Sequence, residues 1–430
     1  MTADLIERRN RALGAGAPLF YREPLHIVRG EGACLFDAAG RRYVDMYNNV
    51  PCVGHAHPRI VEAMAAQQAT LNVHSRYLHE GILELAERIT GLHGERMESV
   101  VFSCTGTEAN EVALRMARAA TGRRGIVCSD AAYHGTSEAV GKLTHVHRRS
   151  PEPGAEVRGF PFPQTYRPLA GGPAGEPIEQ LRDRYLDRLQ AAIDDLTNDG
   201  VGFAALLVCP IFANEGLPTV PDGFMPRAAE IARAAGGVVI ADEVQAGYCR
   251  TGRWWGYEVA GFEPDVVVTG KPMGAGLPLA ATTASRDLVE TFRRGGYFNT
   301  FASSPLQGAV GKAVIDIIED EGLRHNVATV GARLIEGLRD LQPHYPAMGD
   351  VRGHGLFIGV DLVEDPATRA PDREGAANVV NALKDKGFLT ASSGVHNNVV
   401  KMRPPLVLGA ADADAFLAAF RETMADLSGG

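Results

Sequence analysis

The chain has 430 residues, a length that allows two or three domains, or one large α/β domain with a smaller one. Hydrophobic residues make up 45% of the sequence and charged residues 22%, which excludes disordered, collagen-like and coiled-coil proteins as descriptions of the whole chain. The formal net charge is -9, and this acidic balance disfavours a protein that binds nucleic acid through its phosphates.

The sequence predicts neither a secretory signal nor a membrane-spanning segment. Its first residues, MTADLIERRNRALG, include early acidic side chains and no apolar core segment, unlike a secretory signal. The longest apolar stretch, Phe203–Ala213, is far shorter than the ~20 residues of a membrane-spanning helix. Six scattered cysteines without CxxC spacing indicate reduced thiols. We therefore expect a cytoplasmic protein that binds neither membranes nor nucleic acid.

Short apolar runs alternate with helical patterns through the middle of the chain. The apolar runs predict five buried strands, at Val100–Ser103, Gly125–Ser129, Ala204–Cys209, Val238–Ala241 and Val266–Thr269. Helical patterns lie near 108–119, 178–196 and 223–236. This alternation is typical of an α/β fold with a mostly parallel central sheet flanked by helices. Residues 150–177 are rich in proline and glycine, so we expect a long surface loop or lid there.

The pattern changes after about residue 305. Helices are predicted near 306–321, 326–341, 374–386 and 411–426, with the strand-like runs GDVRGHGLFIGVDLV and VVKMRPPL among them. This mixture predicts a smaller α+β domain. The N-terminal run IVRGEGACLFDAAGRRYVDM predicts strands that pack with it. We thus expect an N-terminal segment (1–55), a large domain (56–305) and a small C-terminal domain (306–430).

The first chemically informative segment is Ser103-Cys-Thr-Gly-Thr-Glu-Ala-Asn110, between a predicted strand and a predicted helix. Thr105 and Glu108 have the spacing of a capping box, so the helix should begin here. Gly106 allows a ligand to approach the backbone closely, and Thr107 offers a hydroxyl group. Such a helix N-terminus suits a phosphate, although the same pattern also fits a capped helix with no ligand.

Two further predicted strands end in residues that could carry chemistry. Asp242 ends the run Val239-Ile-Ala-Asp, at the edge of the sheet where open α/β folds bind ligands. Lys271 follows Asp265-Val-Val-Val-Thr-Gly, and a lysine at a strand end suits Schiff-base chemistry. Asp265 and Pro272 exclude a Walker A loop. Alone, Asp242 could simply cap a loop, and Lys271 could be an exposed turn residue.

Together, the three segments match the needs of pyridoxal 5'-phosphate. This cofactor requires a phosphate site, a lysine for the Schiff base and a carboxylate that keeps the pyridine nitrogen protonated. Tyr133, in Ala-Tyr-His-Gly135, could stack on the pyridine ring.

On these motifs the chain resembles the class III aminotransferase family of fold-type-I pyridoxal-phosphate enzymes, from Gly30 to about Leu417. The loop that usually reads Ser-Gly-Ser-Glu-Ala-Asn in this family is Thr105-Gly-Thr-Glu-Ala-Asn110 here. The resemblance implies a homodimer with active sites at the interface and leaves open whether two dimers pair into a tetramer. It also implies that Gly106 and Thr107 bind the cofactor phosphate, that Tyr133, beside His134, stacks on the ring, and that Lys271 forms the Schiff base. Asp242 would contact the ring nitrogen, and Gln245 the side of the ring that carries the hydroxyl group. Thr300 would contact the phosphate of the cofactor bound in the partner subunit.

Two departures from the family pattern concern the substrate. Lys401, in Val400-Lys-Met-Arg-Pro-Pro405, stands where many family transaminases have an arginine for the α-carboxylate. Lysine offers a point charge and no bidentate fork. Cys209, in Val208-Cys-Pro210, stands where transaminases that use 2-oxoglutarate often have a glutamate. Cys209 is expected to be a small buried side chain. Both departures weaken the case for a glutamate-coupled transaminase.

Several segments resemble the ethanolamine-phosphate phospho-lyase branch of the family, which eliminates phosphate from a small phospho-amine. They are Tyr47-Asn-Asn-Val50, Val53-Gly-His-Ala-His-Pro58, Ser75-Arg-Tyr-Leu-His79, Tyr297-Phe-Asn-Thr-Phe301 and Lys401-Met-Arg-Pro-Pro405. The candidate substrate residues are Arg76, Asn49, Lys401 and Arg403. Arg76 could equally be a structural residue, because arginine often forms surface ion pairs.

Other functions stay open from the sequence alone. The main alternative is a transaminase that moves an amino group from an amine or amino acid to a keto acid such as pyruvate. A non-catalytic cofactor-binding protein is disfavoured because Lys271 and Asp242 are both present. The glycine pattern of Gly353–Gly359 lacks the strand-to-helix context of a dinucleotide site. We expect no metal site at His55, His57 or His74, since turn histidines are common.

Overall fold

The computed structural model describes residues 2–144, 154–173 and 175–428. A seven-stranded sheet forms its centre, with the strand order β4-β10-β9-β8-β7-β5-β6. Only β10 runs antiparallel to its neighbours. The strands are β4 (Ser99–Ser103), β5 (Gly125–Ser129), β6 (Val157–Phe160), β7 (Phe203–Val208), β8 (Val238–Asp242), β9 (Val266–Thr269) and β10 (Ala280–Ala284).

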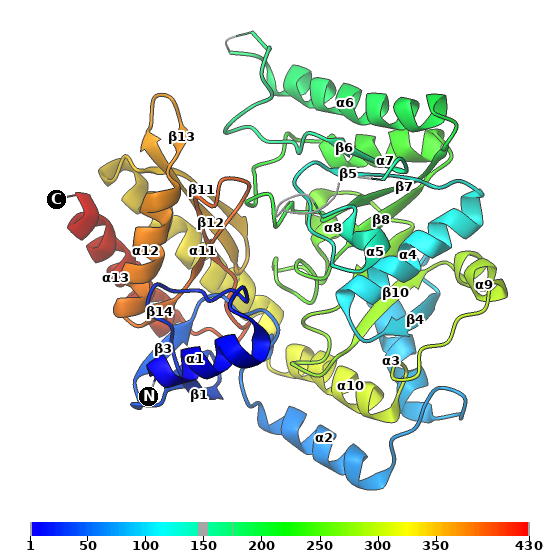
Figure 1. Ribbon diagram of the computed structural model, residues 1–430, viewed down its shortest axis with the longest axis horizontal. Coiled ribbons are helices and arrows are strands. Elements are labelled where there is room, and N and C mark those ends of the chain that lie inside the picture. The colour runs from blue at the N-terminus through cyan, green and yellow to red at the C-terminus, as the bar shows by residue number, and fades with distance from the viewer. Residues whose placement is uncertain (1, 145–153, 174, 429–430) are drawn as a thin grey trace.

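Helices cover both faces of this sheet (Figure 1). Because both faces are covered, β5, β7, β8 and β9 are buried along their whole length, as expected for parallel strands. The helices of this part are α2 (Pro58–Thr70), α3 (Glu80–Gly91), α4 (Gly106–Thr121), α5 (Glu138–Gly141), α6 (Ile178–Asn198), α7 (Phe224–Ala234), α8 (Gly256–Ala260), α9 (Arg286–Arg294) and α10 (Pro305–Asp320).

The C-terminal part contains a second sheet and lies beside the N-terminal strands (Figure 1). Its sheet has the order β11-β12-β16-β15, and β13 pairs with β12. Its elements are α11 (Leu323–Leu341), a 3₁₀ turn (Gln342–His344), β11 (Met348–His354), β12 (Phe357–Asp365), β13 (Ala370–Pro371), α12 (Arg373–Asp385), β14 (Phe388–Leu389), β15 (Ala391–Ser393), β16 (Val399–Met402) and α13 (Ala410–Ser428).

The N-terminal strands share a sheet with a strand from the other end of the chain. After α1 (Thr2–Leu13), the strands β1 (Ile27–Glu31), β2 (Cys34–Asp37) and β3 (Arg42–Asp45) form an antiparallel ribbon. β3 then pairs in parallel with β14. The N-terminal segment therefore lies against the C-terminal part, while the domain boundaries at residues 55 and 305 stay a prediction.

The fold class and the five predicted central strands are confirmed, and two strands of the same sheet were missed. β10 has the sequence AATTA, which has no strongly apolar run. β6 lies inside the segment expected to be only a surface loop or lid, so this expectation is wrong for Val157–Phe160. β6 is an edge strand paired with β5 on one side only, and edge strands need less apolar sequence. Residues 150–153 and 174 of that segment lie outside the described residues.

The packing of α10 on α3 gives a stability prediction. A Cβ added at Gly308 would lie 2.8 Å from the carbonyl carbon and oxygen of Gly81 and 2.9 Å from the Ile82 nitrogen. Because backbone atoms cannot move aside, Gly308→Ala should lower the free energy of unfolding by about 1–3 kcal/mol. Urea denaturation measures this change. Gly91→Ala is the control, since no atom lies within 4 Å of its added Cβ, and a comparable loss there would contradict this explanation.

Candidate active site

The N-terminus of α4 forms one wall of a cavity of 290 Å³. The Thr105 hydroxyl caps the helix by accepting from the Glu108 N–H at 3.3 Å. The Glu108 carboxylate accepts from the Cys104 N–H at 2.7 Å, so the helix begins where the sequence predicts. Gly106 and Thr107, which follow the cap, both line the cavity.

Close packing fixes the walls of this cavity. A Cβ at Gly106 would lie 3.1 Å from both Val244 methyl groups, and one at Gly135 would lie 2.4 Å from Thr107 Oγ1. Thr107 Oγ1 also accepts from the N–H groups of Thr136 and Ser137, at 3.1 and 3.0 Å. The helix N-terminus and the 135–137 loop are thus held together around a space that suits an anion.

Asp242 lies at the end of β8, on the same cavity, and is 5% exposed. Its Oδ2 lies 2.7 Å from His134 Nδ1 and accepts from Asn110 Nδ2 at 3.1 Å. Its Oδ1 accepts from the Val244 N–H at 3.0 Å. These contacts fix the carboxylate in one orientation. Asn110 was not predicted as a site residue, although its place one turn into the capped helix α4 could have identified it.

The structure fits pyridoxal 5'-phosphate at this cavity. His134 Nε2 is buried and has no hydrogen-bond partner among the described residues, and His134 and Tyr133 line the cavity together. The glycine cradle at one end suits a phosphate, and Asp242 at the cavity suits a protonated ring nitrogen. Cys209 also lines it, and burial raises the pKa of its thiol. This confirms Cys209 as a buried side chain.

Lys271 is shared by this cavity and a second one. The side chain follows β9 and lines both cavities. Burial, and then the charge of Arg403, lower the pKa of Lys271. A lowered pKa increases the fraction of neutral amine, which is the form that attacks a carbonyl or accepts a proton.

The second cavity, of 180 Å³, is rich in cationic side chains. Lys401, from β16, and Arg403, just after it, both line the cavity beside Lys271. Both also contact Gln245: Lys401 Nζ donates to its Oε1 at 3.4 Å, and Arg403 Nη1 donates to the same atom. Lys401 Nζ further donates to Ala213 O at 2.7 Å. Lys401 and Arg403, two residues apart in the sequence, therefore face the same cavity.

The described lining of the second cavity carries positive charge and no carboxylate. Its described lining residues are Tyr47, Tyr133, Asn214, Gln245, Lys271, Ser392, Ser393, Gly394, Asn397, Lys401 and Arg403, and none is acidic. Lys401 is 2% exposed, and burial holds its pKa well below the ordinary value. An anionic ligand would relieve this unfavourable burial of positive charge.

Asn214 is a site residue that sequence reasoning missed. It lines both cavities. Its amide donates to Tyr133 O at 3.1 Å, and its Oδ1 accepts from Gln245 Nε2 at 2.9 Å. Asn214 lies in a loop after β7 with no motif around it, so only the strand-end position indicated it.

Three predicted residues do not line either cavity. Arg76 is exposed, and its guanidinium carbon lies 4.0 Å from the centre of the Phe298 ring. Thr300 is also exposed. Asn49 is buried, and its Nδ2 has no hydrogen-bond partner among the described residues. A substrate contact of Arg76 or Asn49 within one subunit is therefore not seen, and the expected contact of Thr300 with the cofactor of the partner subunit stays a prediction.

The histidines near these segments have structural contacts. His55 pairs with Asp45 at 2.8 Å, His57 caps α2 and contacts Glu321, and His74 stacks on Tyr77. In the described part of the chain, no three His, Cys, Asp or Glu side chains group as a metal site would require. No helix there has the length and apolar character needed to cross a membrane.

Fold and site together define a pyridoxal-phosphate enzyme of fold type I. A family model described as aminotransferase class III matches residues 20–424. The chain belongs to this family, and its cofactor is pyridoxal 5'-phosphate.

Three relatives illustrate the range of the family. The alanine–glyoxylate aminotransferase 2-like protein of Drosophila melanogaster is 36% identical, over 98% of this chain and 87% of that protein. The ethanolamine-phosphate phospho-lyase homolog 1 of Caenorhabditis elegans is 32% identical, over 94% and 89%. The structure of an Arthrobacter phospholyase in complex with phosphoethanolamine superposes with a TM-score of 0.94, at 38% identity, over 98% and 99% of the two chains.

Proposed function

We propose that this enzyme is a phospho-lyase that eliminates phosphate from ethanolamine phosphate or a similar small phospho-amine. The observation that carries the proposal is a pair of cationic side chains in the cavity beside Lys271, the buried Lys401 and the partly buried Arg403. A phosphate monoester carries up to two negative charges, which two cationic side chains can neutralise. The likeness to the Arthrobacter phospholyase supports the same substrate class.

In the proposed reaction, the first cavity holds the cofactor and the second holds the phosphate group of the substrate. When bound, pyridoxal phosphate supplies an electron sink for the carbanion at the amine-bearing carbon. Lys271 lies between the cavities, so its neutral amine can take the proton from that carbon. Asp242 would hold the ring nitrogen of the bound cofactor in its protonated form. Lys401 and Arg403 bind the phosphate and stabilise its negative charge as the bond to carbon breaks.

The alternative is a transaminase that uses a keto acid. It is favoured by the similarity to the alanine–glyoxylate aminotransferase 2-like protein, and a carboxylate could also bind at Lys401 and Arg403. Phosphate release distinguishes the two functions. The loaded enzyme, given ethanolamine phosphate and no keto acid, should release phosphate over many turnovers, with equal amounts of acetaldehyde and ammonia. No release, together with amino transfer to pyruvate or glyoxylate, would replace this proposal by the alternative.

Substitution of Lys401 tests whether the second cavity binds the phosphate of the substrate. Lys401→Met keeps the length of the side chain and removes its charge. It should raise KM for ethanolamine phosphate about tenfold or more and change kcat less, because a charge-assisted contact contributes roughly 1.5–3 kcal/mol. Steady-state kinetics measure both constants.

Lys384→Met is the matched control, since Lys384 is also buried but pairs with Asp385 at 2.8 Å. It should leave KM unchanged. An unchanged KM in Lys401→Met would remove Lys401 from the substrate site.

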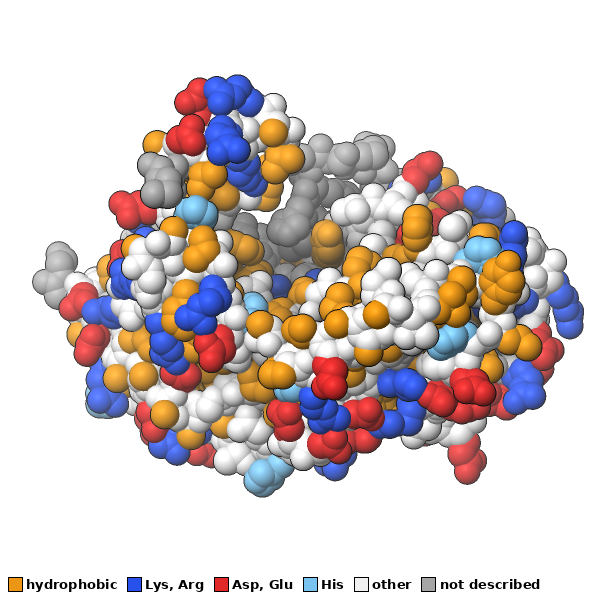
Figure 2. Space-filling view, turned by 90° about the horizontal axis from the view of Figure 1, so that it is seen from below, with side chains coloured by type: hydrophobic (Ala, Val, Ile, Leu, Met, Phe, Trp, Pro, Cys, Tyr) orange, Lys and Arg blue, Asp and Glu red, His pale blue; other side chains and the backbone are white. Residues whose placement is uncertain are grey.

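The proposed working unit is a homodimer, with Arg76 and Thr300 facing the partner subunit's site. Hydrophobic side chains are spread over the middle of the face seen in Figure 2. Two large hydrophobic side chains, Leu78 at 98% and Phe301 at 78%, are strongly exposed, and they lie in the same two segments as Arg76 and Thr300. Large exposed apolar side chains are typical of an interface. Sedimentation should therefore give a dimer or a tetramer, and a stable active monomer would contradict this arrangement.

A further inference from the structure

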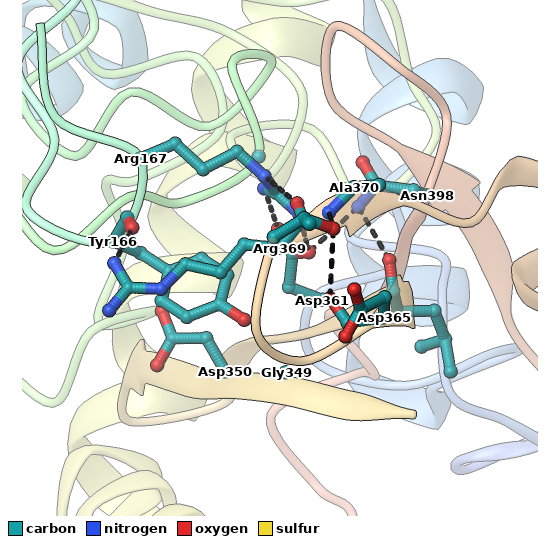
Figure 3. Close-up of polar contacts among 12 residues, drawn as sticks. Tyr166, Arg167, Gly349, Asp350, Asp361, Asp365, Arg369, Ala370 and Asn398 are labelled. Carbon is teal, nitrogen blue, oxygen red and sulfur yellow. Dashed lines mark hydrogen bonds and ion pairs between the residues drawn. The ribbon is translucent and has the colours of Figure 1, made fainter. Parts of the chain in front are cut away.

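A buried polar cluster joins the segment after β6 to the C-terminal sheet (Figure 3). At its centre lies Asp361, on β12, which is 1% exposed. Arg167 approaches from the segment after β6 and donates to both carboxylate oxygens, from Nη1 at 2.8 Å and from Nη2 at 2.6 Å. Bidentate pairs of this kind fix the orientation of both groups.

One arm of the cluster runs from Asp361 to the loop after β7. Arg352, on β11, donates from Nη2 to Asp361 Oδ2 at 3.0 Å. It also donates to Gly216 O, from Nε at 3.1 Å and from Nη2 at 2.9 Å. The same loop contains Asn214, which lines both cavities, and Ala213, whose carbonyl oxygen accepts from Lys401.

A second arm runs from Asp361 to the strand that carries Lys401. Asn398 Nδ2 donates to Asp361 Oδ1 at 2.7 Å and to Leu362 O at 2.9 Å. Asn398 directly precedes β16 and follows the turn that supplies Gly394 and Asn397 to the second cavity. The two arms meet there, because a Cβ at Gly394 would lie 3.5 Å from the Gly216 Cα.

We propose that Asp361, clamped by Arg167, is a positioning residue for the substrate cavity. It touches no residue of the cofactor cavity directly. Through Arg352, Asp361 fixes the position of the 213–216 backbone. Through Asn398, it fixes the position of the preceding turn and of β16, the strand that carries Lys401. The effect on ethanolamine phosphate rests on the function proposed above.

The charges in this cluster explain how Asp361 would control the position of the segments that border the second cavity. Asp361 is shared by two guanidinium groups, and Asp350 accepts from Arg352 Nη1 at 2.8 Å. Removing one partner leaves a buried charge without full compensation, so the remaining groups must rearrange. That rearrangement would move the 213–216 backbone and the 393–398 turn, both of which border the second cavity.

Steady-state kinetics of Arg167→Gln test the role of the bidentate Arg167–Asp361 contact. The variant should raise KM for ethanolamine phosphate about tenfold with a less than twofold change in kcat, because displacement of a binding group by about an ångström is costly. Arg167→Lys, which keeps the charge but loses the bidentate contact, should have an intermediate KM.

Arg158→Gln is the matched control. Arg158 lies on β6, is 23% exposed where Arg167 is 21%, and also binds two carboxylates, those of Asp195 on α6 and of Asp199 just after it. It has no contact with the Asp361 cluster and should keep the wild-type KM. Equal changes in KM and kcat in both glutamine variants would indicate a general loss of stability and would overturn the proposal.

Hydrogen exchange provides a readout that needs no turnover. In the loaded enzyme, Arg167→Gln and Asp361→Asn should raise amide exchange in residues 211–217 and 393–398, and Arg158→Gln should not. Unchanged exchange in these segments would overturn the positioning role. If the wild-type enzyme released no phosphate, the proposed lyase activity would fail, while the exchange result would still decide the role of Asp361.

Discussion

Replacement of Lys271 by alanine should lower kcat by about 10,000-fold and abolish the absorption band of the lysine-bound cofactor. The side chain has two tasks, the covalent attachment of the cofactor and the transfer of a proton at the amine-bearing carbon. It is the lysine that lines both described cavities, so no neighbouring lysine in this region is placed to take over both tasks. Absorption spectra and single-turnover kinetics measure the two losses separately.

The control for this substitution is a lysine remote from the cavities. Lys386 pairs with Glu422 and Asp426, and Lys386→Ala should keep both the spectrum and kcat. If Lys271→Ala kept the absorption band and wild-type turnover, the assignment of Lys271 would be wrong.

Asp242→Asn should lower kcat by about 1,000-fold while the cofactor still binds. Asparagine has the shape of aspartate and could still accept from the Val244 N–H, but it lacks the charge that keeps a ring nitrogen protonated. The substitution also weakens the contact with His134, which lies 2.7 Å from Asp242. Rate constants and cofactor dissociation constants, measured on the same preparation, test this expectation.

Asp265→Asn is a suitable comparison because Asp265 lies at the opposite end of the central strands. It accepts from the Val239 N–H at 2.9 Å and contacts Arg96 and Arg233. Its loss should lower the melting temperature and leave kcat unchanged. A similar kcat in Asp242→Asn and Asp265→Asn would show that the charge at Asp242 is not used in the reaction.

The cofactor side of the site could be predicted because it depends on local sequence. Gly106, Asp242 and Lys271 each follow a strong apolar strand, and the carboxyl ends of parallel strands gather at one edge of a sheet. The positions of the strands in the sequence were therefore sufficient to predict that these residues lie close together, and no long-range contact had to be known.

The substrate side was harder to predict because its contacts join distant segments. Lys401 contacts Gln245 and Ala213 only because β16 packs against the loops after β7 and β8. Asn214, Arg352 and Asp361 have no motif that distinguishes them from surface polar residues. In the proposed dimer, the position of Arg76 relative to a substrate depends on the partner subunit, and such a contact has no local sequence pattern.

The shared wall at Lys271 has a consequence for how new specificities could arise in this enzyme. The residues that hold the cofactor come from the central sheet, whereas Ser392, Gly394, Lys401 and Arg403 come from one short ribbon, β15 and β16 with the turn between them. Exchange of this ribbon alone would change the recognised substrate and keep the chemistry at Lys271. Protein engineers could therefore treat residues 391–403 as a replaceable cassette, provided that Asn398 and its contact with Asp361 are kept.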